Sequence, residues 1–413
     1  MNNISLTSRD LNALLTGKPA EDPEILRELS VGSDFLVQFL KQHYLTSYIP
    51  EGASKIKFLT GRPGSGKTHY GKLLLSEAVS SGFLGVSFSA KDVWLSDFRE
   101  IYLEILRQCD IDRILLGLRD TIIREMNYDP SQIPAGQNLI DYLSEQGKGD
   151  ALTRNTIRDY LRELFLKNPV LDNNFALCCS LLVGDLLGHP TLEAGEREVL
   201  YAFLKGDKTI RFTELRAVGL SPVRITKYNA RHMLRSLGEI VHLAGYSGIF
   251  IVIDDMEILL GRTQSELIRY GKVRREDTYE SLRQLIDDID AMKYLFFLLC
   301  FDRELIDDES RGIKSYQALW FRIQNEIASP RVNRFADILD LDLLAAQIYD
   351  DSVIMTMADR LIDVLLSTDP SLSESLHRLT SEELPSLKDR AEYGGIGLPY
   401  LINRAAIEGG LHD

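Results

Sequence analysis

The chain has 413 residues, of which 45% are hydrophobic and 26% are charged, and this composition is that of a globular protein rather than a disordered or fibrous one. Its formal net charge of −14 does not indicate a protein that coats nucleic acid, because such proteins usually carry a basic surface. The N-terminus lacks the features of a secretory signal, and no apolar stretch is long enough to cross a membrane. We therefore expect a cytoplasmic protein, with its four cysteines reduced in the core.

The first third of the chain changes from helical texture to alternating strands and helices. Residues 1–50 read as a helical segment that includes a helix from Asp34 to about Tyr44. From residue 51 onward, short apolar runs alternate with helical patterns and a glycine-rich turn. The pattern predicts, in order, a strand at Lys55–Thr60, a helix from Lys67 to about Ser80, a strand at Leu84–Phe88 and an amphipathic helix at Phe98–Cys109.

The middle of the chain, from about residue 108 to 245, shows helical spacing and no convincing strand. Strand texture returns at Ile249–Ile253 and Tyr294–Cys300, and weakly at Phe335–Leu341. The first two runs lack alternation and are separated by helices, which indicates an α/β fold with a parallel sheet covered on both faces. We predict a core of residues 51–342 that contains the helical insertion at about 108–245, followed by a helical lid at 343–413.

A glycine-rich turn between the first predicted strand and its helix matches the pattern Gly-x4-Gly-Lys-Ser/Thr. Glycines let consecutive backbone N–H groups surround a polyphosphate, and the following helix directs its positive end at the same point. The lysine would reach the β- and γ-phosphates, and the threonine hydroxyl would bind magnesium. The sequence therefore predicts a P-loop fold that binds ATP with Mg²⁺ through Gly61, Arg62, Pro63, Gly64, Ser65, Gly66, Lys67, Thr68 and the adjoining His69.

An apolar strand that ends in carboxylates supplies the second expected part of the site. Asp254 ends the run Ile249–Ile253, and we predict that it meets the magnesium shell. A second acid at such a site can polarise the attacking water, and Asp255 stands where that acid usually stands. Asp255 is one methylene shorter than the usual glutamate, so Glu257 is the alternative base.

Three further polar residues are candidates on weaker grounds. Asp302, at the tip of the strand Tyr294–Cys300, is predicted to touch the γ-phosphate or the water, or else to be a plain loop carboxylate. Arg334 precedes the last strand, where ring-forming ATPases place an arginine that enters the next subunit's site. This predicts a homo-oligomer, a ring or a nucleotide-bridged assembly. Arg404 is expected to reach the nucleotide from the lid, and the alternatives to Arg334 are a plain surface arginine, Arg331, Arg311 and Arg322.

Several stretches together resemble AAA+ ATPases of the origin-recognition-like branch and, more specifically, the ATP-binding proteins of BREX bacteriophage-exclusion systems. The resemblance rests on Leu11–Pro19, Ser30–Ser33, Gly61–Tyr70, Asp97–Tyr102, Tyr228–Leu234 and above all Asp307–Leu319. It implies ATP hydrolysis in phage defence, acting on DNA or with a helicase or other defence protein. It also implies nucleotide contacts at Val31 and Gly32. Ser33 replaces an arginine usual in that family, Asp255 replaces a glutamate and Asp302 replaces a threonine.

Two other interpretations stay open at this point. The shortened acid Asp255 is compatible with an ATP-gated scaffold or loader that hydrolyses slowly or not at all. Direct DNA binding is the other, although the net charge does not indicate it. The most basic region, residues 203–238, is either a nucleic-acid or partner surface or a solvated helical face.

Overall fold

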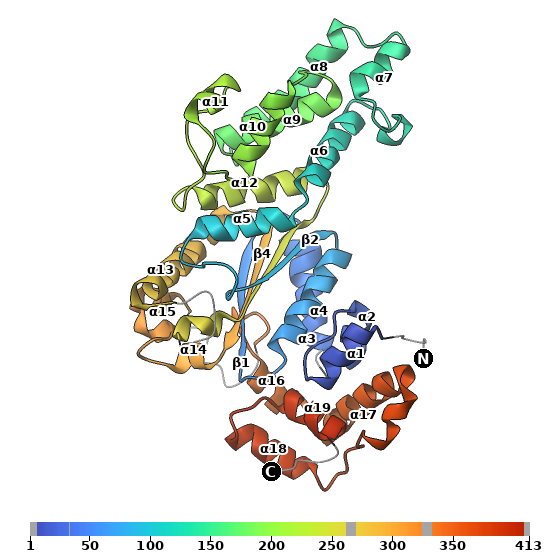
Figure 1. Cartoon of the computed structure of the whole chain (residues 1–413), viewed down its shortest axis with the longest axis vertical. Helices are drawn as coiled ribbons and strands as arrows, with labels where there is room; N and C mark the ends of the chain where they lie inside the picture. Colours follow the sequence, from blue (N-terminus) through green and yellow to red (C-terminus); the bar gives the residue numbers. More distant parts are fainter. Residues whose placement is uncertain (1–5, 33, 262–269, 324–332, 409–413) are drawn as a thin grey trace.

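The structure is a computed structural model that describes residues 6–32, 34–261, 270–323 and 333–408. Figure 1 shows an elongated molecule with a sheet in its middle. A helical insertion extends from one end of the sheet, and the C-terminal helices lie at the other end beside the first helices of the chain.

The sheet has five parallel strands in the order β2-β3-β4-β1-β5. Its strands are β1 (Lys55–Gly61), β2 (Phe83–Ser89), β3 (Gly248–Asp254), β4 (Leu295–Asp302) and β5 (Ile338–Asp340). The predicted α/β class and the predicted strands are thus confirmed, but β5 is only three residues long. Leu341 does not belong to it, because Asp340 caps a helix by accepting hydrogen bonds from the backbone of Asp342 and Leu343.

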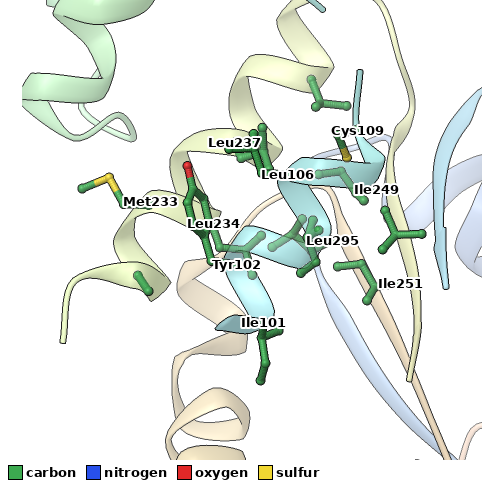
Figure 2. Packing of buried hydrophobic residues seen from close by; sticks show 14 of the residues in the cluster. Ile101, Tyr102, Leu106, Cys109, Met233, Leu234, Leu237, Ile249, Ile251 and Leu295 are labelled. Carbon is green, nitrogen blue, oxygen red and sulfur yellow. The ribbon is translucent and has the colours of Figure 1, made fainter. Parts of the chain in front are cut away.

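The strands are apolar throughout because both faces of the sheet are buried. In β4, alternate side chains enter two different cores: Leu295, Phe297 and Leu299 on one face, and Phe296, Leu298 and Cys300 on the other. One face is covered by α5 (Phe98–Gln108), α12 (Ala230–Leu243) and α13 (Lys272–Asp288). Figure 2 shows the packing there of Ile101, Tyr102, Leu106, Met233, Leu234, Leu237, Ile249, Ile251 and Leu295.

The opposite face of the sheet is covered by α4 (Lys67–Ser80) and by a helix from the second half of the N-terminal segment. That helix is α3 (Asp34–Leu40), and it continues as a π-helical stretch over Lys41–Tyr48, so it extends beyond the predicted end near Tyr44. The four cysteines are buried and free, as predicted.

The insertion between β2 and β3 is helical throughout, as the sequence predicts. Its outer helices are α6 (Ile111–Glu125), α7 (Leu139–Glu145), α8 (Ala151–Leu161), α9 (Asn173–Leu187), α10 (Ala194–Leu204) and α11 (Phe212–Ala217). Their apolar side chains join the same core that α5 and α12 form against the sheet. The insertion is therefore built onto the sheet through a continuous core rather than tethered by a linker.

The C-terminal helices form a separate core, which they share with the start of the chain. These elements are α16 (Leu341–Ile348), α17 (Asp351–Thr368), α18 (Leu384–Tyr393), α19 (Leu398–Glu408), α1 (Ser8–Leu15) and α2 (Pro23–Leu29). Two ion pairs connect α2 and the residues before it with α4. Arg27 pairs with Glu77 at 2.6 Å, and Glu21 pairs with Lys72 at 2.9 Å. The segment 1–50 is thus divided between the lid core and the sheet core.

Two short helices follow β4: α14 (Glu304–Asp307), which packs against the 3-10 turn at Met256–Leu260, and α15 (Gln317–Ile323), which packs against α13. Among the described residues, no helix is both long and apolar enough to cross a membrane.

Candidate functional site

The glycine-rich turn lies where β1 ends and α4 begins. Gly64 and Gly66 adopt positive φ angles of 81° and 96°, which side-chain-bearing residues rarely accept. No side chain caps the first turn of α4, so its amide groups are directed at the turn. The Ser65 hydroxyl is buried in the loop and has no hydrogen-bond partner among the described residues. Such a cradle of amides at a helix start is suited to an anion.

Lys67 is buried at the first position of α4 and points along the turn. Its ammonium forms an ion pair with Asp302 at 2.7 Å and donates to the carbonyl oxygen atoms of Arg62 at 2.9 Å and Gly61 at 3.3 Å. The structure thus brings the predicted residue Asp302 into direct contact with Lys67 of the glycine-rich turn, residues 61–68, which is called the phosphate loop below. A cation held by one carboxylate and two carbonyls can exchange these partners for phosphate oxygens.

Thr68 and Asp254 meet across the turn, although 186 positions separate them in the chain. The Thr68 hydroxyl donates to Asp254 Oδ2 at 2.8 Å. Burial raises the pKa of Asp254 above its usual value, because a partly desolvated carboxylate disfavours its charged form. A hydroxyl and a carboxylate are the oxygen ligands that Mg²⁺ prefers, so this pair fits the metal. Mg²⁺ is usually held by one or two carboxylates together with substrate phosphates, and this arrangement needs no larger protein cage.

Asp255 follows directly and is oriented by two neighbours from the end of β2. Its backbone has a positive φ of 59°. Its carboxylate accepts from Ser89 Oγ at 2.6 Å and pairs with Lys91 Nζ at 2.9 Å. Both Asp255 and Lys91 face the cavity described below. The ion pair places a lysine beside the predicted base.

Glu257 lies on the next turn and contacts the neighbouring strand. Its Oε2 accepts from the backbone N–H of Asp302 at 3.3 Å. Burial, and then the negative charge of Asp302, raise the pKa of Glu257 to about 7. A carboxyl group with a pKa near neutrality can accept and release a proton under physiological conditions. The structure therefore places four acids around the turn: Asp254, Asp255, Glu257 and Asp302.

A cavity of about 850 Å³ opens in front of the turn, a size within the usual range of small-molecule sites. Its walls come from three parts of the chain: the N-terminal helices, the phosphate loop and the lid. The predicted residues Gly64, Ser65, Gly66, Lys67, Thr68, His69, Asp254, Asp255 and Val31 all line it. Further along, the lining is more apolar, with Leu14, Leu29, Tyr349, Met357 and Leu361. The cavity thus combines a polar end that is suited to phosphate with an apolar region.

His69 and Gly32 support the cavity wall near the N-terminal helices. His69 Nε2 lies 2.7 Å from the Ser30 hydroxyl. Burial, helped by the nearby charge of Lys72, lowers the pKa of His69 to about 4, so its imidazole is neutral at pH 7. Gly32 has a positive φ of 79°, and a Cβ atom there would approach Ile348 and Val353 to 3.1 Å. Gly32 therefore allows the chain to pass close to the lid helices.

The lid contacts the phosphate loop through backbone atoms. The N–H of Gly397 donates to Pro63 O at 2.8 Å, and the N–H of Tyr400 donates to Gly64 O at 3.2 Å. Arg62 adds a third link, because its guanidinium donates to Ala391 O. Glycine is required at 397, since a Cβ atom there would lie 2.3 Å from the backbone nitrogen of Ser65. The start of α19 is thus seated directly on the loop.

Two predicted arginines lie away from the phosphate loop. Arg334 is exposed and precedes β5, so it lies at the amino ends of the parallel strands, whereas the turn lies at their carboxyl ends. Its guanidinium lies 4.7 Å from the ring centre of Phe39. Arg404 forms an ion pair with Glu408 and does not line the cavity. Of the alternatives, Arg311 donates to Leu260 O at 3.2 Å and Arg322 pairs with Asp287 at 2.9 Å. Arg331 and Ser33 lie outside the described residues.

The structure also adds cavity residues that sequence reasoning did not select. Tyr400 and Asn403 face the cavity from α19, in place of Arg404. Lys91 comes two residues after β2 ends, and Lys72 lies on α4. Lys91 had a usable signal, because the carboxyl ends of parallel strands meet at one edge of the sheet.

The comparisons with known proteins are consistent with this site. No solved structure and no curated protein is similar to the chain at a significant level. A protein-family model described as "BREX system ATP-binding protein BrxC/D" matches residues 11–397. The match spans the N-terminal helices, the phosphate loop, the insertion and most of the lid. The chain therefore belongs to the BrxC/D family of BREX system ATP-binding proteins.

Proposed function

We propose that the chain is a Mg²⁺-dependent ATPase that binds ATP in the 850 Å³ cavity and hydrolyses it. The observation that carries the proposal is the 2.8 Å hydrogen bond between Thr68 and Asp254, at the uncapped start of α4 and beside Lys67. This arrangement combines an anion cradle with a magnesium-type oxygen pair. Membership of an ATP-binding family makes ATP the natural ligand.

In the proposed complex the amides of the turn and Lys67 bind the β- and γ-phosphates, and Thr68 and Asp254 hold Mg²⁺. The metal would neutralise the charge that develops on the transferred phosphoryl group. The base and ribose would lie toward the apolar part of the cavity, which includes Val31. The partly buried carboxylate of Asp254, whose pKa is raised by desolvation, favours a nearby cation.

Two acids compete for the role of aligning the attacking water. Asp255 is favoured because it lines the cavity and is fixed by Lys91 and Ser89. Glu257 is the second candidate because its pKa is about 7. Asp302 would release Lys67 when the nucleotide binds and could then contact the γ-phosphate or the water.

We also propose that the chain is an AAA+ ATPase of the origin-recognition-like branch that works as an oligomer. The parallel sheet bears the phosphate loop on β1 and acids on β3 and β4, and a helical lid closes over them. Arg334 is exposed and lies away from the phosphate loop of its own chain, so it is available to the site of another copy. Hydrolysis would be coupled to a helicase, another defence protein or DNA in phage defence.

A nucleotide-gated scaffold is the second candidate function. It is favoured by the shortened acid Asp255 and by the direct seating of α19 on the phosphate loop. In such a protein ATP binding would set the position of the lid, and turnover would be slow or absent.

The deciding experiment is phosphate release by the purified chain with ATP and Mg²⁺, alongside direct titration of a fluorescent ATP analogue. Binding with turnover supports the ATPase. Binding without turnover, in the presence or absence of DNA, supports the scaffold. Failure to bind the analogue contradicts both.

A further inference from the structure

The charge of the helical insertion is unevenly distributed along the chain. Residues 109–204 contain nine basic and 15 acidic side chains. The next stretch, residues 205–228, reverses this balance and is here named the basic segment. It contains only the acids Asp207 and Glu214, against Lys205, Lys208, Arg211, Arg216, Arg224 and Lys227. A local excess of positive charge in a protein of net charge −14 is suited to a polyanion.

Most of these cations are accessible. Lys205, Lys208, Arg211, Arg216 and Lys227 are all exposed. The ion pairs of Lys208 with Glu100, at 3.9 Å, and of Arg211 with Glu214, at 3.4 Å, involve basic side chains that are 71% and 79% exposed. Pairs as exposed as these contribute little, so phosphates can replace them. The Asp207 carboxylate accepts hydrogen bonds from the backbone N–H and the hydroxyl of Thr209.

Two aromatic rings lie exposed among the cations. Tyr228 is 82% exposed and Phe212 is 46% exposed. Lys227 Nζ lies 5.2 Å from the Tyr228 ring centre, and the Arg224 guanidinium lies 4.8 Å from that of Phe212. An exposed ring beside a cation offers a stacking platform next to a phosphate contact. Side chains of this kind would gain little from a duplex, in which the base faces are already stacked.

The basic segment is held in place by the core rather than hanging free. Arg99 of α5 is buried and donates to the carbonyl oxygen atoms of Gly206 and Ile225, near the two ends of the segment. In Figure 1 the segment descends from α11 to the start of α12, and the sheet lies between it and the lid. The surface is therefore preformed and separate from the ATP cavity.

We propose that the basic segment binds single-stranded nucleic acid, with phosphates along its lysines and arginines and bases stacked on Tyr228 and Phe212. The inference goes beyond the ATPase and does not depend on it. Single-stranded DNA and RNA share the chemistry that this surface recognises, and the experiment separates them.

The test is fluorescence anisotropy of the full-length protein with labelled oligo-dT, oligo-U and duplex DNA of about 20 nucleotides. Both salt conditions, about 50 and about 200 mM, are needed because phosphate contacts release counterions. We expect single strands to bind more tightly than the duplex and to weaken at higher salt. The preferred single strand identifies DNA or RNA. No binding of either single strand at low salt, or tighter binding of the duplex, would overturn the proposal.

Matched variants locate the surface. Tyr228→Ala should weaken single-strand binding by roughly 5- to 100-fold, the range expected for one lost stacking contact. Tyr393→Ala, which removes an 81% exposed tyrosine from the lid, should not. The double variant Lys205→Ala/Lys227→Ala should reduce the salt dependence, whereas the exposed Lys148→Ala should leave it unchanged. All four variants should keep wild-type ATP-analogue affinity. Equal oligonucleotide binding by Tyr228→Ala and Tyr393→Ala would show that the surface lies elsewhere.

Discussion

At Lys67, one ammonium group connects the phosphate loop with the tip of β4. Its partners, Asp302 and the carbonyl oxygen atoms of Gly61 and Arg62, must be exchanged if a triphosphate is to bind. Asp302 therefore has two consequences, since it keeps a buried lysine paired and it competes with the nucleotide for that lysine.

We expect Lys67→Ala to weaken ATP-analogue binding at least tenfold and to abolish turnover. The loss of a charge-assisted hydrogen bond to phosphate accounts for a reduction of this size. Isothermal titration calorimetry and phosphate release measure the two effects. The exposed Lys148→Ala, between α7 and α8, serves as the control. Unchanged ATP hydrolysis in Lys67→Ala would remove the proposed site.

The two candidate bases are separated by Asp255→Asn and Glu257→Gln. The variant that removes the true base should lower kcat by roughly 10²–10⁴-fold while ATP binding persists. If Glu257 is the base, wild-type turnover should rise as the pH passes through about 7, where its carboxyl loses its proton. If Asp255 is the base, Glu257→Gln should stay active, and its turnover should depend on pH in the same way as that of the wild type.

Glu257 also makes stability depend on pH. Its pKa is about 7 in the folded protein and near the ordinary 4.5 in the unfolded chain, so between these values the folded state binds the extra proton. The free energy of unfolding should therefore fall as the pH rises from about 4.5 to about 7. Glu257→Gln should remove this fall, which is at most about 3 kcal/mol. Denaturant titrations of both proteins across this range provide the measurement, and parallel pH curves would contradict the prediction.

Sequence alone predicts part of this site and misses part of it, for physical reasons. Thr68 and Asp254 could be paired because Asp254 ends β3 and Thr68 follows β1, and the carboxyl ends of parallel strands lie together. Asn403 was missed in favour of Arg404, its neighbour on α19. Which of the two faces the cavity depends on how the buried Ile402 and Ala405 seat the helix, and that is decided by tertiary packing.

Among the elements, α19 has the closest relation to the phosphate loop. Gly397, directly before the helix, donates to Pro63 O, and Tyr400 in its first turn donates to Gly64 O. A side chain at Gly397 would have no space. The loop carbonyls are thereby fixed by the lid itself. A change in the position of the phosphate loop must therefore be transmitted to α19.

Gly397→Ala should separate these two elements. The added methyl group would lie 2.3 Å from Ser65 N, and relief of such overpacking costs about 1–3 kcal/mol. We expect a lower melting temperature and a smaller stabilisation by ATP in thermal unfolding. Gly195→Ala is the matched control, because in α10 its methyl group would meet no described atom within 4 Å. Equal ATP-induced shifts in the two variants would contradict the contact.

The accuracy with which helices and strands were predicted depended on how strong the local sequence pattern was. Strands β3 and β4 were located closely because each apolar run has the length of a strand and is flanked by helical patterns. Strand β5 was predicted too long, since the backbone turns at Asn333–Ala336 and Asp340 already caps α16. The sharing of one core by α1, α2 and the lid could not be predicted, because the pattern within a helix does not identify its partner.

For the whole molecule, the feature that bears on assembly is an exposed arginine away from the phosphate loop. Arg334 is exposed at the opposite edge of the sheet from the turn, beside the rings of Phe39 and Phe335. If it acts in another copy, Arg334→Ala should bind ATP normally but hydrolyse it about 10³-fold more slowly.

Mixing the inactive variants tests this arrangement. Arg334→Ala has an intact phosphate loop, and Lys67→Ala has an intact arginine, so a mixed oligomer should regain part of the turnover that each lacks alone. Sedimentation of the wild type with ATP would report the assembly. Full activity from a strictly monomeric wild type would rule out the trans arrangement.

The core that joins α1 and α2 to the lid has a consequence for synthesis on the ribosome. The backbone N–H of Leu6 donates to the Thr368 hydroxyl, 362 positions away, so the first helices meet their partners last. At about 5–20 residues per second, this leaves the apolar faces of α1 and α2 uncovered for roughly 20–70 seconds. The cavity has walls from both helices and lid, so in the proposed complex the nucleotide would gain its full set of contacts only after α17 and α19 have emerged.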